Sequence, residues 1–381
     1  MNAVYINRIS AYLPNDPVGN DEMEAVLGMV GERPSRSRRL ILRNNGIRKR
    51  HYVLDPKTGE PRYNNAQLTA QAIRKLADSE FALNQIDCLA TGTSNPDQLL
   101  PNHAVMVHGE LGIPPCEAVA TAGICLAGTT ALKYAWLNVL SGQANNAVAT
   151  GSEMASISLR AQQYAAETEQ QLQALEERPE LAFEKDFLRW MLSDGAGAML
   201  LQNQPNREGR SLRIDWIDVF SYANELPACM YAGADRDEHG KLIGWSRFSH
   251  DEIGQRSVFA LKQDVKLLNA NVVEYCLAKP LRELRQKRQL RADNVDWFLP
   301  HMSSQYFKQP IHDALQAIDF AIPYERWFTN LVERGNTGSA SIYLMLEELF
   351  NQDRLVQGQT LLCFVPESGR FSSAFIHLTV V

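Results

Sequence analysis

The sequence has few cysteines, few aromatic residues and no long apolar segment. Its six cysteines are scattered over 381 residues and make no CxxC pair, which argues against a zinc cage and against a disulfide framework. No stretch approaches the ~18 uninterrupted apolar residues that a membrane-spanning helix needs. The first eight residues also lack a cationic lead into an apolar run. We therefore expect a cytoplasmic protein that does not enter a membrane.

The sequence also lacks an excess of positive charge and the common cofactor motifs. A formal net charge of −6 disfavours a general nucleic-acid binder. There is no GxxxxGK[ST] loop, Gly195–Leu200 lacks the third glycine of a dinucleotide fingerprint, and Gly151-Ser152-Glu153 is no nucleophile elbow. We expect neither a nucleotide nor a metal cofactor, and we interpret the glycines near 195 as close backbone packing.

The patterns that are present indicate an α/β fold made of two similar halves. Short apolar runs that end at small polar turns alternate with longer helical patterns. Three elements occur twice, in the same order and about 210 residues apart, which suggests an internal duplication. The pairs are Ile86–Ala90 with Val295–Pro300, Thr121–Gly128 with Glu333–Ser341, and Ala147–Glu153 with Leu361–Glu367.

We place the two halves at residues 1–205 and 206–381. The stretch from about 155 to 190 is polar and helical with a thin apolar stripe. It predicts either an inserted helical cap over a site or an ordinary pair of surface helices.

Cys125 is the strongest candidate for a nucleophile. It lies in a Gly-x-Cys-x-x-Gly turn at a predicted helix N-terminus, where oriented amide groups favour a thiolate and lower the pKa of the thiol below ~8.5. The alternative is a small buried apolar residue. The other five cysteines fit that alternative.

His301 and Asn336 are the candidate partners of Cys125. His301 follows the apolar run Trp297–Pro300 and so emerges at the end of a buried strand. Asn336 lies in Gly-Asn-Thr-Gly before a helix of small residues, where a turn or N-cap role is the alternative. If the halves superpose, Cys125 and Asn336 occupy equivalent helix starts near His301. A nucleophile with two neutral donors suits acyl transfer to sulfur and stabilisation of an enolate oxygen. A papain-like protease would need a different cysteine context.

The chain resembles β-ketoacyl-acyl-carrier-protein synthase III, a condensing enzyme of the thiolase superfamily. The resemblance runs nearly end to end, and its specificity comes from the order of its motifs. These are Ile9–Pro14, Gly46–His51, the Cys125 turn, Asp194–Ala198, Val295–His301 and Gly335–Thr337.

This resemblance implies a thiolase-like five-layered αβαβα sandwich and a homodimer. It implies that Cys125 accepts the acyl group, with its own N–H in the oxyanion hole, and that His301 and Asn336 promote decarboxylation and hold the enolate. It also implies that Leu100 reaches the acyl pocket of the partner subunit. Ser304 and Phe371 are further candidate substrate-binding residues. Acyl groups would arrive on the phosphopantetheine of an acyl carrier protein, without a resident cofactor.

The sequence departs from the family pattern at three places. Arg38–Leu42 stands where the family has a tryptophan for coenzyme A, Pro366–Phe371 replaces a glycine-rich loop, and the cap is longer. These features are similar to those of specialised-metabolite synthases. One such branch cyclises its product to a cyclohexanedione, the precursor of dialkylresorcinols or stilbenes. In that branch an extra base would deprotonate the ring-closing carbon, and Glu153 is our candidate, with a purely structural role as the alternative.

A basic cluster between residues 33 and 50 predicts a docking site for an acidic acyl carrier protein; the candidate residues are Arg36, Arg38, Arg39 and Arg43.

Our functional hypothesis is a ketosynthase that condenses an enzyme-bound acyl thioester with a malonyl- or β-ketoacyl-carrier protein, with or without cyclisation. The alternatives are a cysteine-dependent acyltransferase to an alcohol or amine and a non-catalytic partner subunit.

Overall fold

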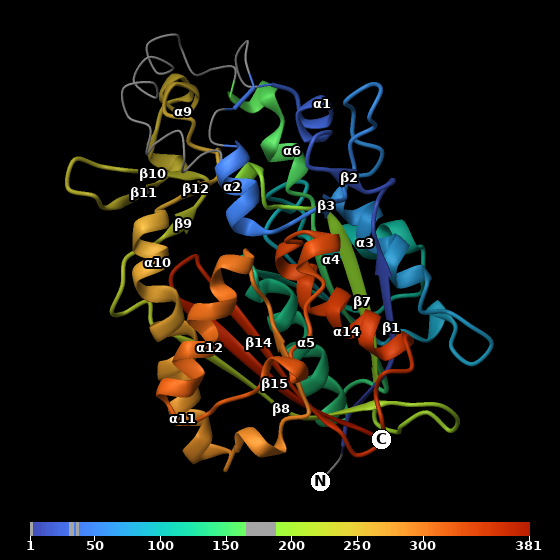
Figure 1. Cartoon of the computed structure of the whole chain (residues 1–381). Helices are drawn as coiled ribbons and strands as arrows, with labels where there is room; N and C mark the ends of the chain where they lie inside the picture. The colour runs from blue at the N-terminus through green and yellow to red at the C-terminus, as the bar shows by residue number, and fades with distance from the viewer. Residues whose placement is uncertain (1–2, 30–33, 36–37, 165–187) are drawn as a thin grey trace.

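The computed structural model describes residues 3–29, 34–35, 38–164 and 188–381. Its centre is a nine-stranded sheet with the order β13-β14-β15-β8-β1-β7-β6-β4-β5 (Figure 1). The strands of the N-terminal half are β1 (Tyr5–Tyr12), β4 (Cys88–Thr93), β5 (Glu117–Ala122), β6 (Asn146–Glu153) and β7 (Gly195–Gln202). Those of the C-terminal half are β8 (Leu212–Ser221), β13 (Trp297–Pro300), β14 (Thr360–Glu367) and β15 (Ser372–Val380).

The two halves repeat one strand order on either side of a junction. They meet where Tyr5 and Ile6 of β1 pair with β8. Outward from the junction, the N-terminal half runs β1-β7-β6-β4-β5 and the C-terminal half runs β8-β15-β14-β13. Where a partner to β13 would complete the repeat, Phe298 makes an isolated parallel bridge to Trp327. The predicted α/β fold of two repeated halves is confirmed, and the boundary expected at residue 205 falls between β7 and β8.

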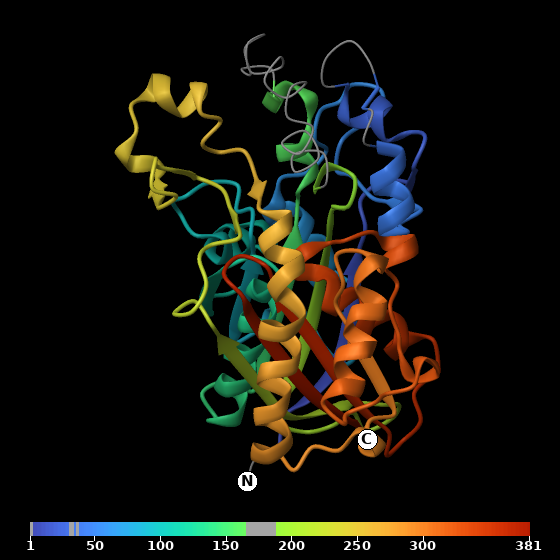
Figure 2. The ribbon, with the colours of Figure 1, turned by 60° about the vertical axis from the view of Figure 1, so that its left-hand side comes forward.

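Helices and sheet halves alternate in five layers (Figures 1 and 2). On the outer face of the N-terminal half lie α3 (Asn65–Arg74) and α4 (His103–Leu111), whose apolar side chains share a core with β4, β6 and β7. Between the halves lie α5 (Leu126–Leu140) and α14 (Ser341–Asn351), which share a core with strands of both. The outer face of the C-terminal half carries α10 (Val265–Val273), a π-helical turn (Glu274–Ala278), α11 (Lys279–Lys287) and α12 (Lys308–Ala317).

Strand β14 shows how the sequence produces these layers. Alternate side chains of a strand point to opposite faces of its sheet. Leu361, Cys363 and Val365 accordingly pack in the central core, while Leu362 and Phe364 pack beneath the outer helices. Both faces are buried, which explains why this strand is a continuous apolar run in the sequence.

Glycines allow the central helices to lie against the strands. A Cβ atom added at Gly92 of β4 would overlap the carbonyl oxygen of Ala127, and one at Gly197 of β7 would overlap the Cβ atom of Tyr343. The predicted close packing of backbones near residue 195 is therefore confirmed. It places the start of α5 directly against the carboxyl end of β4.

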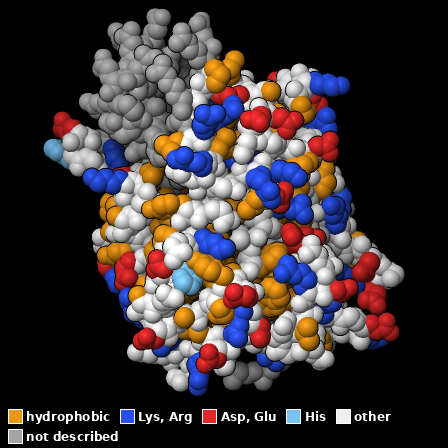
Figure 3. Space-filling view, viewed as in Figure 1, with side chains coloured by type: hydrophobic (Ala, Val, Ile, Leu, Met, Phe, Trp, Pro, Cys, Tyr) orange, Lys and Arg blue, Asp and Glu red, His pale blue; other side chains and the backbone are white. Residues whose placement is uncertain are grey.

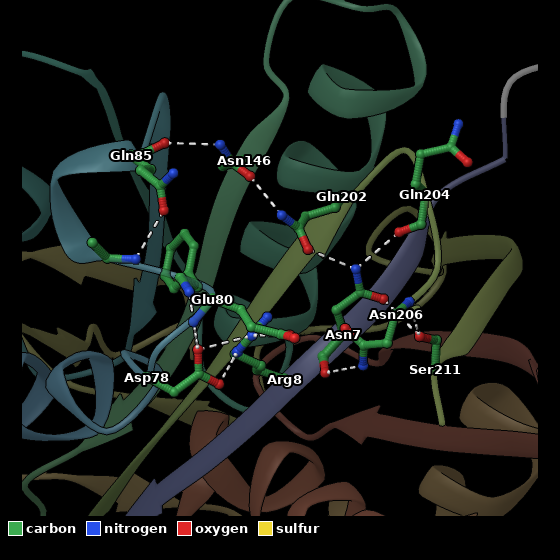
Figure 4. A network of polar contacts seen from close by, with 12 residues as sticks. Asn7, Arg8, Asp78, Glu80, Gln85, Asn146, Gln202, Gln204, Asn206 and Ser211 are labelled. Atoms are coloured by element: carbon green, nitrogen blue, oxygen red, sulfur yellow. Dashed lines mark hydrogen bonds and ion pairs between the residues drawn. The ribbon is translucent and has the colours of Figure 1, made fainter. Parts of the chain in front are cut away.

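A polar network joins neighbouring strands at the end of the sheet opposite the carboxyl ends of β4 and β6 (Figure 4). The side-chain nitrogen of Asn7 in β1 donates to Oε1 of Gln202 in β7 at 2.6 Å, and Gln202 donates to Asn146 at the start of β6 at 2.7 Å. The hydroxyl of Ser211, just before β8, donates to Asn7 at 2.7 Å. The network fixes β1, β6, β7 and β8 relative to one another.

Shorter elements surround the top of the sandwich. They are β2 (Val18–Gly19), α1 (Met23–Leu27), α2 (Arg38–Asn45), β3 (Lys49–Arg50), α6 (Ser156–Leu159) and α13 (Leu331–Arg334). Residues 230–263 form an arm that projects from the body in Figures 1 and 2; it contains β9 (Met230–Tyr231), β10 (Ala234–Arg236), β11 (Leu242–Gly244), α9 (His250–Gln255) and β12 (Lys262–Gln263). Most of the predicted cap, residues 165–187, lies outside the described residues. Within the part of the chain that the structure describes, no helix has the length and apolar character needed to span a bilayer.

Candidate active site

Cys125 lies where β5 passes into the central helix layer. β5 ends at Ala122, Gly123 turns the chain with a φ of 155°, and Cys125 is the N-cap of α5. Such a φ is easily adopted only by glycine. The hydroxyl of Thr121 donates to the carbonyl oxygen of Ala127 at 2.7 Å, which fastens the end of the strand to the first turn of the helix. The predicted helix start is therefore confirmed.

Two cavities open at Cys125. The smaller, of about 50 Å³, is lined mainly by apolar side chains of α10, α12 and β14, together with His301. The larger, of about 350 Å³, has Glu153 and Asn336 in its lining. Cys125 lines both cavities. The structure thus brings the four predicted catalytic residues to one pair of cavities that share a cysteine.

His301 enters the smaller cavity directly after β13. Its backbone N–H donates to the carbonyl oxygen of Phe364 at 2.8 Å, so the strand pairing of β13 and β14 positions it. Burial lowers the pKa of His301 from 6.5 to about 4. The imidazole is therefore neutral near pH 7 and can donate from one ring nitrogen and accept at the other.

Asn336 both forms a local turn and lines the larger cavity. Its Oδ1 accepts a hydrogen bond from the N–H of Gly338 at 3.0 Å, as a turn-forming asparagine does. Its backbone is held by Met191 and Ser193, through bonds of 3.1 and 2.8 Å. Because the side-chain oxygen is engaged, the NH₂ group is the part that can donate to a substrate oxygen.

Glu153 ends β6 and is buried at the floor of the larger cavity. Its Oε1 accepts from the hydroxyl of Ser94 at 2.6 Å, and its Oε2 accepts from the N–H of Ser339 at 3.2 Å. Burial raises the pKa of Glu153 from 4.5 to about 7, and these hydrogen bonds limit the rise. A carboxyl group with this pKa can take up and release a proton near neutral pH.

The thiol of Cys125 differs from the sequence-based prediction. Although the residue is only partly buried, the loss of water around its sulfur raises its pKa well above the usual range, and the carboxylates of Glu367 and Glu153 add to the effect. The expectation that the helix start lowers this pKa is wrong. Oε2 of Glu367 accepts from the N–H groups of Ile124 at 2.8 Å and Leu126 at 3.0 Å, so a carboxylate occupies the amide groups on either side of Cys125.

The predicted substrate-binding residues lie outside the linings of both cavities. Ser304 is buried, and its hydroxyl contacts the carbonyl oxygen of Asn44 and the N–H of Tyr306. Phe371 is fully buried in the outer core with a φ of 55°. Leu100 is 85% exposed, and its predicted contact with a partner subunit stays a prediction.

The four arginines predicted to dock a carrier protein differ in their surroundings. Arg36 lies outside the described residues. Arg38 makes an ion pair with Glu24 of α1 and a longer one with Asp21 at 3.6 Å. Arg39 and Arg43 are exposed on α2, and lysine and arginine side chains appear over this helix in Figure 3.

Sequence reasoning missed several residues that line the cavities. Ser303 and Ser368 line both cavities. Ser94 holds Glu153, and its place directly after a predicted strand was an available signal. The arm also contributes to the larger cavity through Met230, Tyr231, Ala232, Phe259, Leu261 and Gln263, which no motif indicated.

Comparisons with known proteins agree with this architecture. A family model described as 3-Oxoacyl-[acyl-carrier-protein (ACP)] synthase III C terminal matches residues 285–374. A β-ketoacyl-[acyl-carrier-protein] synthase III of Chlorobaculum tepidum is 23% identical over an alignment of 361 residues that covers 93% of this chain and 93% of the relative. Among solved structures, the tetronic acid condensing enzyme AbyA1 matches with a TM-score of 0.75 at 21% identity, over 99% of both chains.

A second structural relative is a variant of OleA from Xanthomonas campestris. It matches with a TM-score of 0.73 at 18% identity and covers 99% of this chain and 98% of its own. The curated relative and both structures span nearly the whole chain, and the family model covers the segment that carries His301 and Asn336. The chain is therefore similar to β-ketoacyl-[acyl-carrier-protein] synthase III over nearly its whole length, and it shares the fold of these condensing enzymes.

Proposed function

We propose that the chain is a ketosynthase that condenses an acyl group bound to Cys125 with a malonyl- or β-ketoacyl-carrier protein. The observation that carries this proposal is the position of Cys125 at the meeting of two cavities, one with His301 and the other with Glu153 and Asn336. One sulfur can thereby present an acyl group to two sets of polar groups.

The first step is acyl transfer to Cys125. The sulfur attacks the thioester carbonyl of an acyl-carrier protein, the bond to the phosphopantetheine sulfur breaks, and that sulfur leaves with the thiol proton. The N–H of Cys125 is our candidate donor to the developing oxyanion. No cofactor is required, because both the bond that breaks and the bond that forms are thioester bonds.

The second step forms the carbon–carbon bond. With a malonyl donor, loss of carbon dioxide generates an enolate, which attacks the Cys125 thioester. The products are a β-ketoacyl-carrier protein and a thiol that takes up one proton. His301 and the NH₂ group of Asn336 would donate to the enolate oxygen, and both are neutral donors that do not surrender a proton to it. The low pKa of His301 fits this role, since it keeps the ring uncharged.

Glu153 is the candidate for proton transfer at carbon. A β-ketoacyl donor has no carboxylate to lose, so a base must remove a proton from its α-carbon before it attacks. A carboxyl group with a pKa of about 7 in the lining of the larger cavity can do so near neutral pH. The same group could remove the second proton that ring closure to a cyclohexanedione requires.

We propose that the carrier protein docks beside α2. Acyl carrier proteins are acidic, and an exposed pair of arginines, Arg39 and Arg43, offers complementary charge. Arg38 is a weaker candidate than the sequence indicated, because Glu24 already pairs with it. A cytoplasmic location stays a prediction.

We further propose a homodimer that forms along β5. This strand is the edge of the sheet, and none of its residues is buried, so its outer backbone groups can pair with a second copy. Leu99 and Leu100 are 67% and 85% exposed nearby. A Leu100→Asp variant should sediment as a monomer where the wild type is a dimer. A monomeric wild type would refute the proposal.

Intact-mass analysis with a panel of acyl-carrier proteins tests the function. The wild type should gain the mass of one acyl group, and Cys125→Ala should gain none. His301→Ala should still load but should not condense when malonyl- or β-ketoacyl-carrier protein is added. A loaded enzyme that passes its acyl group to an alcohol or amine, with no new carbon–carbon bond, would establish the acyltransferase alternative. An enzyme that never loads would establish the non-catalytic one.

A further inference from the structure

Two glutamates occupy equivalent positions in the two halves and reach across to the opposite half. Glu153 ends β6 and Glu367 ends β14, and each of these strands is the third from the junction in its half. Glu153 accepts from the N–H of Ser339, just before α14. Glu367 accepts from the N–H groups of Ile124 and Leu126, at the start of α5. Each half therefore supplies a carboxylate to the helix start of the other.

A glycine makes room for each carboxylate. A Cβ atom at Gly338 would overlap Oε2 of Glu153, and one at Gly123 would lie 3.2 Å from Oε2 of Glu367. Both glycines have positive φ angles, of 51° and 155°. The fit between glycine and carboxylate at both places shows that Glu367 belongs to the architecture of the Cys125 turn.

The contacts of Glu367 determine which amide of the turn stays available. One oxygen holds the N–H groups of residues 124 and 126, which flank the nucleophile. The N–H of Cys125, which lies between these two amides in the chain, is not among the donors to Glu367. Pro366 and Ser368 line the cavities, whereas Glu367 lines neither. The carboxylate therefore acts on the turn from behind the reacting atoms.

We propose that Glu367 is a positioning residue for the nucleophile. Its carboxylate holds the two amides that flank Cys125 and so fixes the turn that presents this residue to both cavities, and its charge keeps the sulfur as a neutral thiol in the free enzyme. This inference rests on the proposed function only in giving Cys125 the role of nucleophile.

The charges around Cys125 act in the same direction. The groups that face it are the carboxylates of Glu367 from β14 and Glu153 from β6, and the thiol of Cys276 from the π-helical turn. His301, after β13, is neutral near pH 7. Among the described residues that line the two cavities, none is lysine or arginine. No cation in these linings offsets the negative charge.

The test measures the rate at which iodoacetamide alkylates Cys125 as a function of pH. No acyl donor is present, so the result does not depend on the proposed reaction. Peptide mass mapping separates Cys125 from the other cysteines, and Cys125→Ala gives the blank. The variants are Glu367→Gln, which removes the charge and keeps one oxygen acceptor, and Glu367→Ala, which removes both. Glu208→Gln, on an exposed turn after β7, is a matched control for the loss of one charge.

Because only the thiolate reacts, the rate below the pKa follows the thiolate fraction. Removing a nearby unit charge should raise the rate at pH 7.5 about tenfold or more in Glu367→Gln, and Glu208→Gln should match the wild type. Glu367→Ala should also alkylate quickly. In a separate assay with an acyl donor, which does depend on the proposed function, it should load acyl groups more slowly than Glu367→Gln, because its turn is no longer held. A Glu367→Gln profile within about threefold of the wild type would overturn the proposal. The wild type alone provides a second test: its rate should still rise above pH 9, and a plateau below pH 8.5 would refute the role of the charge.

Discussion

Replacing Glu153 by glutamine should shift the stability of the protein relative to the wild type, and this shift should be more favourable at pH 8 than at pH 5. Glu153 is 3% exposed, and burial raises its pKa from 4.5 to about 7. At pH 8 the wild type therefore carries a buried carboxylate. Glutamine has nearly the same shape and no charge. Its oxygen can still accept from the hydroxyl of Ser94, although its NH₂ group would then face the N–H of Ser339.

The size of the effect follows from linkage between protonation and folding. The pKa of Glu153 is higher in the folded protein than in the unfolded chain. Its favourable contribution to the free energy of unfolding is therefore fully present below pH 4.5 and is lost as the pH rises through 7. At about 1.4 kcal/mol for each tenfold change in proton affinity, the wild type loses about 2–3 kcal/mol from this group between pH 5 and pH 8. Glutamine does not titrate, and the fixed cost of about 1 kcal/mol for its mismatched contact is the same at both pH values.

Thermal unfolding at the two pH values measures the effect. For a chain of 381 residues, 2–3 kcal/mol corresponds to about 2–4 °C in the melting temperature. The difference between Glu153→Gln and wild type should grow by this amount from pH 5 to pH 8. Asp194, whose pKa burial raises to about 6, titrates in both proteins and largely cancels in the difference. A difference in melting temperature that is equal at the two pH values would refute the reasoning.

Three further predictions concern packing, charge and docking. Gly92→Ala should lower the melting temperature and prevent acyl loading, because its Cβ overlaps the Ala127 carbonyl oxygen. Gly109→Ala, in open space on α4, should instead stabilise the fold by up to about 1 kcal/mol. Equal melting temperatures for the two variants would contradict this. With a malonyl donor, which needs no proton removal by Glu153, the condensation rate of preloaded enzyme should show no inflection near pH 6.5, since the pKa of His301 is about 4. An inflection there that His301→Asn abolishes would disprove it. Charge reversal at Arg39 and Arg43 should raise KM for acyl-carrier protein at low salt but leave KM for an acyl-pantetheine unchanged, and an equal change for both substrates would exclude docking at α2.

The repeat of the two halves was predictable because the strands concerned are buried on both faces. Such strands appear in the sequence as uninterrupted apolar runs, and the polar residue after each run marks the carboxyl end. Glu153 and His301 were found in this way. Cys125 and Asn336 were found from glycines, because a sharp turn into a helix needs a φ that few other residues adopt.

Sequence reasoning fell short where adjacent residues of a turn have different orientations, and where folding brings a distant residue into contact. The turn after β13 presents Ser303 to both cavities and buries its neighbour Ser304. Adjacent residues in a turn point in different directions, and their types are the same here, so the sequence could not separate them. Arg38 belongs to an exposed basic pattern in the sequence, but folding brings it to Glu24 of α1.

The pKa of Cys125 is the clearest case in which local reasoning reached the right place and the wrong chemistry. A helix start does offer unpaired N–H groups to an anion, and the sequence located that start correctly. Which anion uses those groups is a tertiary question. Glu367 reaches them only because duplication places the end of β14 beside the start of α5. Once a carboxylate occupies the site, the same N–H groups stabilise Glu367 instead of the thiolate, and its charge opposes ionisation of the sulfur. The helix start then serves to fix the geometry of the nucleophile, and the proton of Cys125 must be removed when the acyl group arrives.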